Sequence, residues 1–495
     1  MAPLGESVLE RTIADIHEAY RSGMFSCRKL VQLYLDRIHA YDKQGACINA
    51  IITINPNVLN EAEQLDLAYR PTGPVGLLHG IPIVVKDQVD VKGMPTTLGS
   101  ILFKNYYPDR DSFVAAKLKR AGAVILGKSS LGEMAGGDTH GSLFGSTRNP
   151  YDLDRTVGGS SGGSAAAVTA NFCTVAVGQE GLASIRRPAA WNSIVGMRTT
   201  AGLISRGGVY SGWPSMAGSL GPMARTIQDM SVLLDAMVGY DPEDPLTAYG
   251  YGHFSGSFTS YLQKDGLKGA RLGILREPMG IDSEPLSEDF KKVCEVFDNS
   301  VNELRDAGAE IVDPVIIPKL NELLSKRATA PGESDQSFQS YFGRSARAPF
   351  SSMAQILASS DFPRLSRNTQ RRLSASSDSD KHYECLKARD ELMTNVLKVM
   401  ADNRLDAIVH KAVEHQPTRI SDGLNPPYIN YKGAPHLNTF LVFVPSVVVP
   451  AGFTRDRLPA GIVFFGRPYD DGKMIRYAYA YEQATKHRKP PESTP

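Results

Sequence analysis

The chain has 495 residues, of which 42% are hydrophobic and 22% charged, an ordinary composition for a soluble globular enzyme with a substantial core. Lys plus Arg number 54 and Asp plus Glu 53. A formal net charge of +1 gives no electrostatic reason to expect nucleic acid or an anionic membrane as a partner. Five cysteines without a CxxC pair argue against a disulfide scaffold or zinc ribbon. We therefore expect a cytoplasmic protein whose partner is a small molecule.

The first seventy residues predict helices. TIADIHEAYRSG (12–23) spaces its apolar residues at the helical period, and Ser26 stands where an N-cap would start a second helix over 27–41. The N-terminus becomes charged before any apolar stretch forms, so we expect no signal peptide.

From residue 75 to about 240, short apolar runs alternate with glycines and helical stretches. The runs are GIPIVVKD (80–87), VAAKLKRAGAVILGKSS (114–130) and SAAAVTANFCTVAVG (164–178). Strands that alternate with helices are typical of a sheet covered on both faces. The pattern predicts an α/β fold with a mixed central sheet.

The segment 245–430 is more polar, and we expect it to be largely helical and to shape substrate entry. Two further apolar runs follow, LDAIVH (405–410) and the Val-rich run 441–453. The second run is too short for a membrane helix and is interrupted twice by proline. Residues 431–495 are then predicted to complete the core as a strand and a helix. Without an internal repeat, one domain over 1–495 is the better interpretation.

Two motif matches have simpler structural explanations. GAVILGKS (122–129) fits the phosphate-binding P-loop pattern, but its Ala-Val-Ile-Leu interior favours a buried strand. SCRK (26–29) fits the S-x-x-K of penicillin-recognising enzymes without that family's companion motifs, and a helix cap explains Ser26 better.

A third match, GGSSG (158–162), fits the G-x-S-x-G turn that would make Ser160 the nucleophile of an α/β-hydrolase. The preceding YDLDRTV is not the apolar strand that such a turn requires, and no downstream Asp and His stand out as partners. The ten histidines are scattered without metal-ligand spacing, so we expect no metal site. A flexible linker is also excluded, because AAAV and FCTVAVG follow at once and must be buried. The stretch is predicted to be a rigid loop inside the fold.

Motifs along most of the chain resemble the amidase signature family. GGSSGGSAAAV follows GSTRNPYD and precedes ASIRRPAAWNSIVGMRTTAGLIS (183–205). LLHGIPIVVKDQVDVKGMPTTLGS (77–100) is similar to the family's lysine segment, and 449–491 is similar to its C-terminal strand, turn and helix. The resemblance extends over the chain except roughly 245–430.

The resemblance implies a cofactor-independent catalytic triad. Ser184 would be the nucleophile, Ser160 the bridging serine that relays its proton, and Lys86 the base, with a cis peptide bond between Gly159 and Ser160. A lysine acts as a base only when neutral, which requires burial beside apolar groups. The GIPIVVK setting of Lys86 supplies those groups.

The family's oxyanion loop implies backbone N–H donors at Gly181, Leu182 and Ala183, just before the nucleophile. The family usually reads TDTGGSIR, whereas this chain reads QEGLASIR (179–186). Two glycines are thus replaced, which changes the loop if either position requires a positive φ.

Glu180 takes the place of the family's usual Asp. We expect Glu180 to pair with Arg186 and hold the loop as a structural support.

Substrate contacts are predicted on two segments. The loop after the GKSS strand, GGDTHGSLFG (136–145), and the aromatic segment GVYSGWPS (208–215) are expected to line the pocket. The candidate substrate-binding residues are Asp138, His140, Phe144, Tyr210 and Trp213.

The leading functional hypothesis is an amidase that hydrolyses a carboxamide through a serine acyl-enzyme. The alternatives are acyl transfer to an amine in the same site, a glutamine-dependent amidotransferase A-type subunit, and a catalytically dead scaffold. Near-neutral charge and the lack of a tRNA-binding extension weigh against the amidotransferase. A homodimer is left open.

Overall fold

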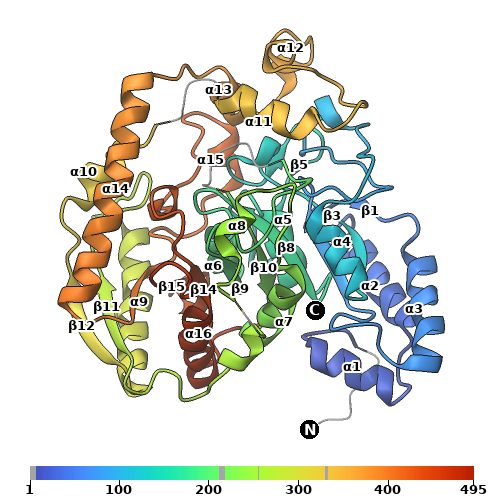
Figure 1. Cartoon of the computed structure of the whole chain (residues 1–495), viewed down its shortest axis with the longest axis horizontal. Helices are drawn as coiled ribbons and strands as arrows, with labels where there is room; N and C mark the ends of the chain where they lie inside the picture. Colours follow the sequence, from blue (N-terminus) through green and yellow to red (C-terminus); the bar gives the residue numbers. More distant parts are fainter. Residues whose placement is uncertain (1–6, 211–217, 255, 329–332) are drawn as a thin grey trace.

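The computed structural model describes residues 7–210, 218–254, 256–328 and 333–495. Within these residues, eleven strands form one mixed sheet in the order β1-β3-β2-β8-β10-β9-β14-β15-β13-β11-β12. Figure 1 shows this sheet running through the molecule with helices around it. The strands of the sheet are β1 (Ile51–Ile54), β2 (Pro82–Lys86), β3 (Val124–Ser129), β8 (Val175–Glu180), β9 (Val195–Arg198), β10 (Ser219–Ala224), β11 (Arg271–Leu275), β12 (Glu310–Val315), β13 (Ala407–Lys411), β14 (Ser446–Phe453) and β15 (Pro459–Phe465).

Parallel and antiparallel neighbours are combined in this sheet. β2 pairs in parallel with β3 on one side and β8 on the other, while β10 is antiparallel to both β8 and β9. The register places Val84 opposite Ala176 and Val85 opposite Val177, all four fully buried. The predicted α/β fold with a mixed central sheet is confirmed.

Helices cover both faces. α5 (Gly162–Thr169) packs on β2, β8 and β10, and α6 (Arg186–Trp191) packs on β9, β14 and β15. α7 (Ile227–Met237), α9 (Glu288–Asp306) and α16 (Asp471–Thr485) cover the other face. All residues of α5 are buried, and its small side chains allow a close approach: a Cβ added to Gly163 would lie 2.3 Å from the carbonyl oxygen of Ser130.

The N-terminal region is helical, as its apolar spacing predicts. Helices α1 (Ile13–Arg21), α2 (Cys27–Tyr41) and α3 (Val58–Thr72) come first, and α4 (Phe113–Arg120) precedes β3. The Ser26 side chain accepts a hydrogen bond from the N–H of Lys29 and caps α2. The P-loop match over 122–129 is the buried strand β3 and the turn before it.

The segment 245–430 is not only helical. Helices make up most of its regular structure, but it also contributes β11, β12 and β13 to the main sheet, and β11 and β12 were not expected from the sequence. These strands are short, and β12 at the sheet edge is only partly buried, so its residues lack the apolar run that marks a central strand. Besides α9, its described helices are α8 (Thr247–Gly250), α10 (Leu320–Ser325), α11 (Glu333–Phe342), α12 (Met353–Leu357), α13 (Arg367–Leu373), α14 (Ser379–Asp402) and α15 (Ile420–Leu424).

Two small ribbons lie beside the sheet and lead into the glycine-rich loop. β4 (His140–Gly141) pairs with β5 (Gly145–Ser146), and β6 (Arg148–Asn149) pairs with β7 (Asp152–Thr156). β7 is a short polar strand of a two-stranded ribbon, not the central apolar strand that an α/β-hydrolase nucleophile turn follows.

No helix among the described residues has the length and apolar character that crossing a membrane requires. The described part of the chain also holds no group of three or more His, Cys, Asp or Glu side chains suited to a metal ion.

Candidate active site

Neighbouring strand ends bring the predicted catalytic residues together. Lys86 is the last residue of β2, and Ser184 lies between the end of β8 and α6. Because β2 and β8 are parallel neighbours, their carboxyl ends meet at one edge of the sheet. Ser160 reaches the same edge from the loop between β7 and α5.

The three side chains form a continuous polar chain. Lys86 Nζ lies 2.7 Å from Ser160 Oγ, and Ser160 Oγ lies 3.0 Å from Ser184 Oγ. Lys86 and Ser160 have no exposed surface, while Ser184 retains 6%. The Gly159–Ser160 peptide bond is cis, as the resemblance implied. The distances suit proton transfer between Ser184 and Lys86 through Ser160.

Burial controls the charge of Lys86. The loss of solvent lowers the pKa of Lys86 well below that of an exposed lysine, and the nearby Glu180 carboxylate opposes the shift only in part. The amine also donates to the carbonyl oxygen of Gln179 at 3.2 Å, which fixes the end of the side chain. A lower pKa favours the neutral amine, the form that can accept a proton.

The loop that carries Ser160 is bonded on both sides. The Thr139 hydroxyl donates to the carbonyl oxygen of Gly158 at 2.8 Å and accepts from the N–H of Gly162 at 3.1 Å. The Ser161 hydroxyl donates to the carbonyl oxygen of Gln179 at 3.0 Å and so stabilises the turn. These bonds fix the position of Ser160 relative to β8.

The loop before Ser184 leaves backbone donors without partners. Within the described residues, the N–H groups of Leu182, Ala183 and Ser184 donate no hydrogen bond, whereas the next N–H, of Ile185, donates to Glu180 at 2.8 Å. Neither Leu182 nor Ala183 has a positive φ. The replacement of two glycines therefore does not strain this loop, and its free N–H groups can stabilise a developing oxyanion.

Glu180 and Arg186 hold this loop, as predicted. Arg186 Nε lies 2.7 Å from Glu180 Oε1, and both side chains are fully buried. The same carboxylate accepts from the N–H of Arg186 at 2.9 Å and from the Asn438 side chain at 3.2 Å. Arg186 also donates to the carbonyl oxygen of Leu182 at 2.7 Å. The ion pair thus connects the oxyanion loop to the C-terminal part of the chain.

Side chains from the segment 245–430 and from the part of the chain that follows it pack on the loop before Ser184. Leu182 and Ala183 form a small apolar cluster with Ala434, and Ile281 and Tyr431 pack against it. The residues that replace the family glycines are therefore packed against side chains that are distant in the sequence.

Arg187, three residues after Ser184, was missed in the sequence. Its guanidinium is fully buried, forms an ion pair with Asp138, and lies 5.1 Å from the Trp191 ring and 5.6 Å from the Tyr431 ring. Its Nε and Nη1 have no hydrogen-bond partner among the described residues. The sequence feature that could have indicated Arg187 is the second of two arginines among the apolar residues of IRRPAAW. Asn438 and Thr139 gave no local signal.

The predicted substrate residues lie in different places. Asp138 and His140 line a cavity beside the catalytic loop, and Phe144 lines a neighbouring hollow. Tyr210 is 4% exposed and packs against the rings of Tyr341 and Phe342, so its role as a pocket wall stays a prediction.

Trp213, the remaining substrate candidate, lies outside the described residues.

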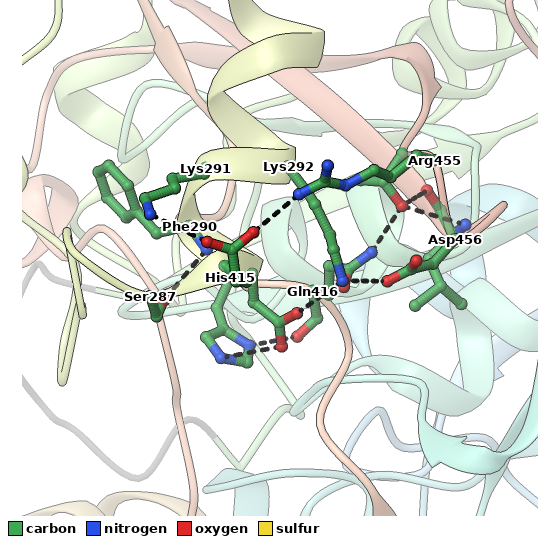
Figure 2. A network of polar contacts seen from close by, with 12 residues as sticks. Ser287, Phe290, Lys291, Lys292, His415, Gln416, Arg455 and Asp456 are labelled. Atoms are coloured by element: carbon green, nitrogen blue, oxygen red, sulfur yellow. Dashed lines mark hydrogen bonds and ion pairs between the residues drawn. The ribbon is translucent and has the colours of Figure 1, made fainter.

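A polar network joins the start of α9 to His415, Gln416 and the turn between β14 and β15 (Figure 2). The Trp191 indole N–H donates to the carbonyl oxygen of His415 at 2.9 Å. The His415 ring lies 3.4 Å from Asp289 at the start of α9, and Lys292 of the same helix pairs with Asp456 at 2.5 Å. Trp191, at the end of α6, is therefore connected to α9 and to the turn between β14 and β15.

Comparison with known proteins gives a consistent result. The family model described as Amidase matches residues 29–475. The chain is 31% identical to the A-type subunit of glutamyl-tRNA(Gln) amidotransferase from Thermoanaerobacter pseudethanolicus over 97% of this chain and 98% of that protein. It is 32% identical to a probable amidase of Arabidopsis thaliana over 98% of this chain and 92% of that protein.

Solved structures agree with the sequence comparison. The native peptide amidase of Stenotrophomonas maltophilia superposes with a TM-score of 0.88 at 31% identity, covering 99% of this chain and all of that chain. The A-type subunit of glutamyl-tRNA(Gln) amidotransferase from Thermotoga maritima superposes with a TM-score of 0.76 at 27% identity over 98% of each chain. The chain therefore belongs to the amidase signature family, whose enzymes act on carbon–nitrogen bonds.

Proposed function

We propose that this protein hydrolyses a carboxamide through an acyl-enzyme formed on Ser184. The observation that carries the proposal is the continuous contact from Lys86 through Ser160 to Ser184, with the lysine fully buried and its pKa lowered. Similarity over nearly the whole chain to the peptide amidase and to the probable plant amidase supports the same reaction.

The reaction starts when Ser184 Oγ attacks the amide carbon and its proton passes through Ser160 to neutral Lys86. The free N–H groups of Leu182 and Ala183 stabilise the negative oxygen of the tetrahedral intermediate. When the C–N bond breaks, Lys86 returns the proton through Ser160 to the leaving nitrogen. An ester on Ser184 and a free amine or ammonia result.

Water then completes the turnover by the same route. Lys86 accepts a proton from water through Ser160, the hydroxide adds to the ester carbonyl, and the carboxylic acid leaves as Ser184 regains its proton. An amine in place of water would instead give a new amide, which is the acyltransferase alternative.

Fluorophosphonate labelling followed by peptide mass spectrometry tests the nucleophile. Label on the peptide that contains Ser184, lost in Ser184→Ala, supports the proposal. Label on Ser160 would contradict it and favour the α/β-hydrolase interpretation. Ser161→Ala is the matched control, because Ser161 is buried in the same loop but its hydroxyl, among the described residues, bonds to the backbone of Gln179.

Product analysis separates hydrolysis from transfer. Carboxylic acid from small and peptide amides, with hydroxamate only when hydroxylamine is added, supports the amidase. Ammonia release confined to glutamine and dependent on co-purified proteins would instead indicate the amidotransferase function of the related A-type subunits.

A further inference from the structure

A small cavity adjoins the loop that carries Ser160. It has a volume of about 230 Å³, and its walls come from 136–147, from 364–368 at the start of α13, and from 419–430 around α15. Figure 1 shows α13 and α15 near each other at one end of the molecule. Pockets for drug-sized ligands hold about 300–1,000 Å³, so this cavity suits one small group of a substrate.

The cavity wall is in backbone contact with the loop that carries Ser160. Thr139, which lines the cavity, is bonded to Gly158 and Gly162 on either side of that serine. A Cβ added to Gly159 would lie 3.0 Å from the Cα of Asp138, another wall residue. A group bound here is therefore next to the reaction centre.

The cavity carries excess positive charge. Among the described residues that line it, Asp138 is the one acidic side chain, and the buried Arg187 neutralises it. Arg367 and Arg419 also line the cavity, and neither has a carboxylate partner in the described part of the chain. Arg364, by contrast, pairs with Asp361 at 2.7 Å.

Apolar side chains complete the cavity. Leu365, Ile420 and Leu424 line it. Arg367 and Arg419, which have no carboxylate partner in the described part of the chain, line it as well. His140 adds no positive charge at pH 7, because burial lowers its pKa and favours the neutral ring. The lining therefore combines contacts for a short aliphatic chain with planar guanidinium groups that fit a carboxylate.

We propose that this cavity binds the carboxylate of an amide substrate that carries a short aliphatic chain between its carboxylate and its amide. The proposal rests on the proposed amidase function, because it names the substrate class of that same site. The carboxylate would contact Arg367 and Arg419, the chain would contact the three apolar residues, and the amide would lie at Ser184.

Kinetics with matched substrates test this assignment. Monoamides of straight-chain dicarboxylic acids with four to seven carbons are compared with uncharged amides of the same length. We expect a preference for one length of the charged series. Arg419→Gln or Arg367→Gln should lower kcat/KM for the charged amide about tenfold and change that for the uncharged amide less than about twofold.

Arg371→Gln is the control for a general loss of positive charge. Arg371 is exposed on the same helix, α13, and lies outside this cavity. An equal loss in Arg371→Gln would overturn the proposal, because the effect would then come from the overall field. Equal kcat/KM for charged and uncharged amides in the unmodified protein would also overturn it while leaving the amidase function intact.

Calorimetric binding to Ser184→Ala separates this proposal from the proposed function. The charged monoamide should bind about tenfold more tightly than its uncharged counterpart, and Arg419→Gln in the same background should remove the difference. Such binding without any turnover by the unmodified protein would support the cavity assignment and contradict the amidase function. Equal binding of both amides would overturn the cavity assignment.

Discussion

Lys86 Nζ and Ser160 Oγ lie 2.7 Å apart although 74 positions separate the two residues in the chain. Neither side chain has exposed surface. A buried amine this close to a hydroxyl is positioned to exchange a proton with it.

The activity is expected to depend on the protonation of Lys86. Burial lowers the pKa of Lys86, and only its neutral form accepts a proton, so kcat/KM should fall about tenfold per pH unit below that pKa. Lys86→Arg should remove the activity, because arginine stays protonated. A pH profile of kcat/KM checks both expectations, and near-full activity of Lys86→Ala at pH 8 would contradict the role of the lysine.

The two serines are expected to differ in the size of their effects. Ser184→Ala removes the nucleophile and should lower kcat on the order of 10⁶-fold, as for other serine nucleophiles. Ser160→Ala removes the relay and should lower kcat about 10²–10⁴-fold. Single-turnover kinetics on an ester substrate, with Ser161→Ala beside them, measure each step. Unchanged rates in Ser160→Ala would show that Lys86 acts on Ser184 by another route.

Breaking the ion pair of the oxyanion loop should destabilise the protein. Glu180→Gln leaves the fully buried Arg186 without its carboxylate partner. The loss of one member of a buried pair costs about 3–5 kcal/mol, measurable as a lower midpoint in urea unfolding. Arg457→Gln is the matched control, because Arg457 pairs with Glu492 at an exposed position. A stability loss no larger than in that control would show that the pair is not required.

Substitutions at Leu182 test how the protein tolerates a larger residue where the family has glycine. Leu182→Ala removes a buried side chain from the cluster with Ala434 and should cost about 2–5 kcal/mol. Leu182→Gly should cost roughly 1 kcal/mol more and should not raise kcat, because the residue does not have a positive φ. Unfolding curves and kcat for both variants separate the packing effect from the backbone effect. A higher kcat in the glycine variant would contradict this interpretation.

A buried carboxyl far from the active site should make stability depend on pH. Burial raises the pKa of Glu482 to about 7 from 4.5. The folded state thus holds this proton more tightly than the unfolded chain, and the stabilisation present below pH 4.5 is lost as the pH rises through 7.

Glu482→Gln should therefore unfold with a free energy about 3–4 kcal/mol higher than the unmodified protein at pH 8, because the pKa difference between 4.5 and about 7 corresponds to roughly 1.4 kcal/mol per pKa unit. The difference should be much smaller at pH 4.5. Urea unfolding at both pH values measures it, with the exposed Glu295→Gln as control. The same difference at both pH values would show that ionisation of Glu482 is not the cause.

The sequence predicted the parts of the fold that consist of long apolar runs. β2, β3, β8 and β14 fall within such runs, and α2 begins directly after its predicted cap. The strands β11 and β12 were missed because RLGIL and EIVDPV are short and partly polar. Their strand conformation depends on neighbours distant in the chain, which local patterns do not encode.

The candidate site likewise combines residues that the sequence predicted with residues that it did not. Lys86, Ser160 and Ser184 belong to contiguous motifs and were predicted before the structure brought them together. Asn438 and Tyr431 reach the site from a different part of the chain, and neither stands in a motif. Their positions follow from packing against the oxyanion loop, which only the three-dimensional structure supplies.

The strand order has a consequence for biosynthesis. β14 and β15 lie between β9 and β13 in the sheet although both are made after them. While a ribosome is still producing the chain, β9 and β13 therefore each have an unpaired edge, the kind of surface that promotes aggregation. We expect that nascent chains released before residue 446 bind chaperones, and that the sheet becomes continuous only when both late strands insert.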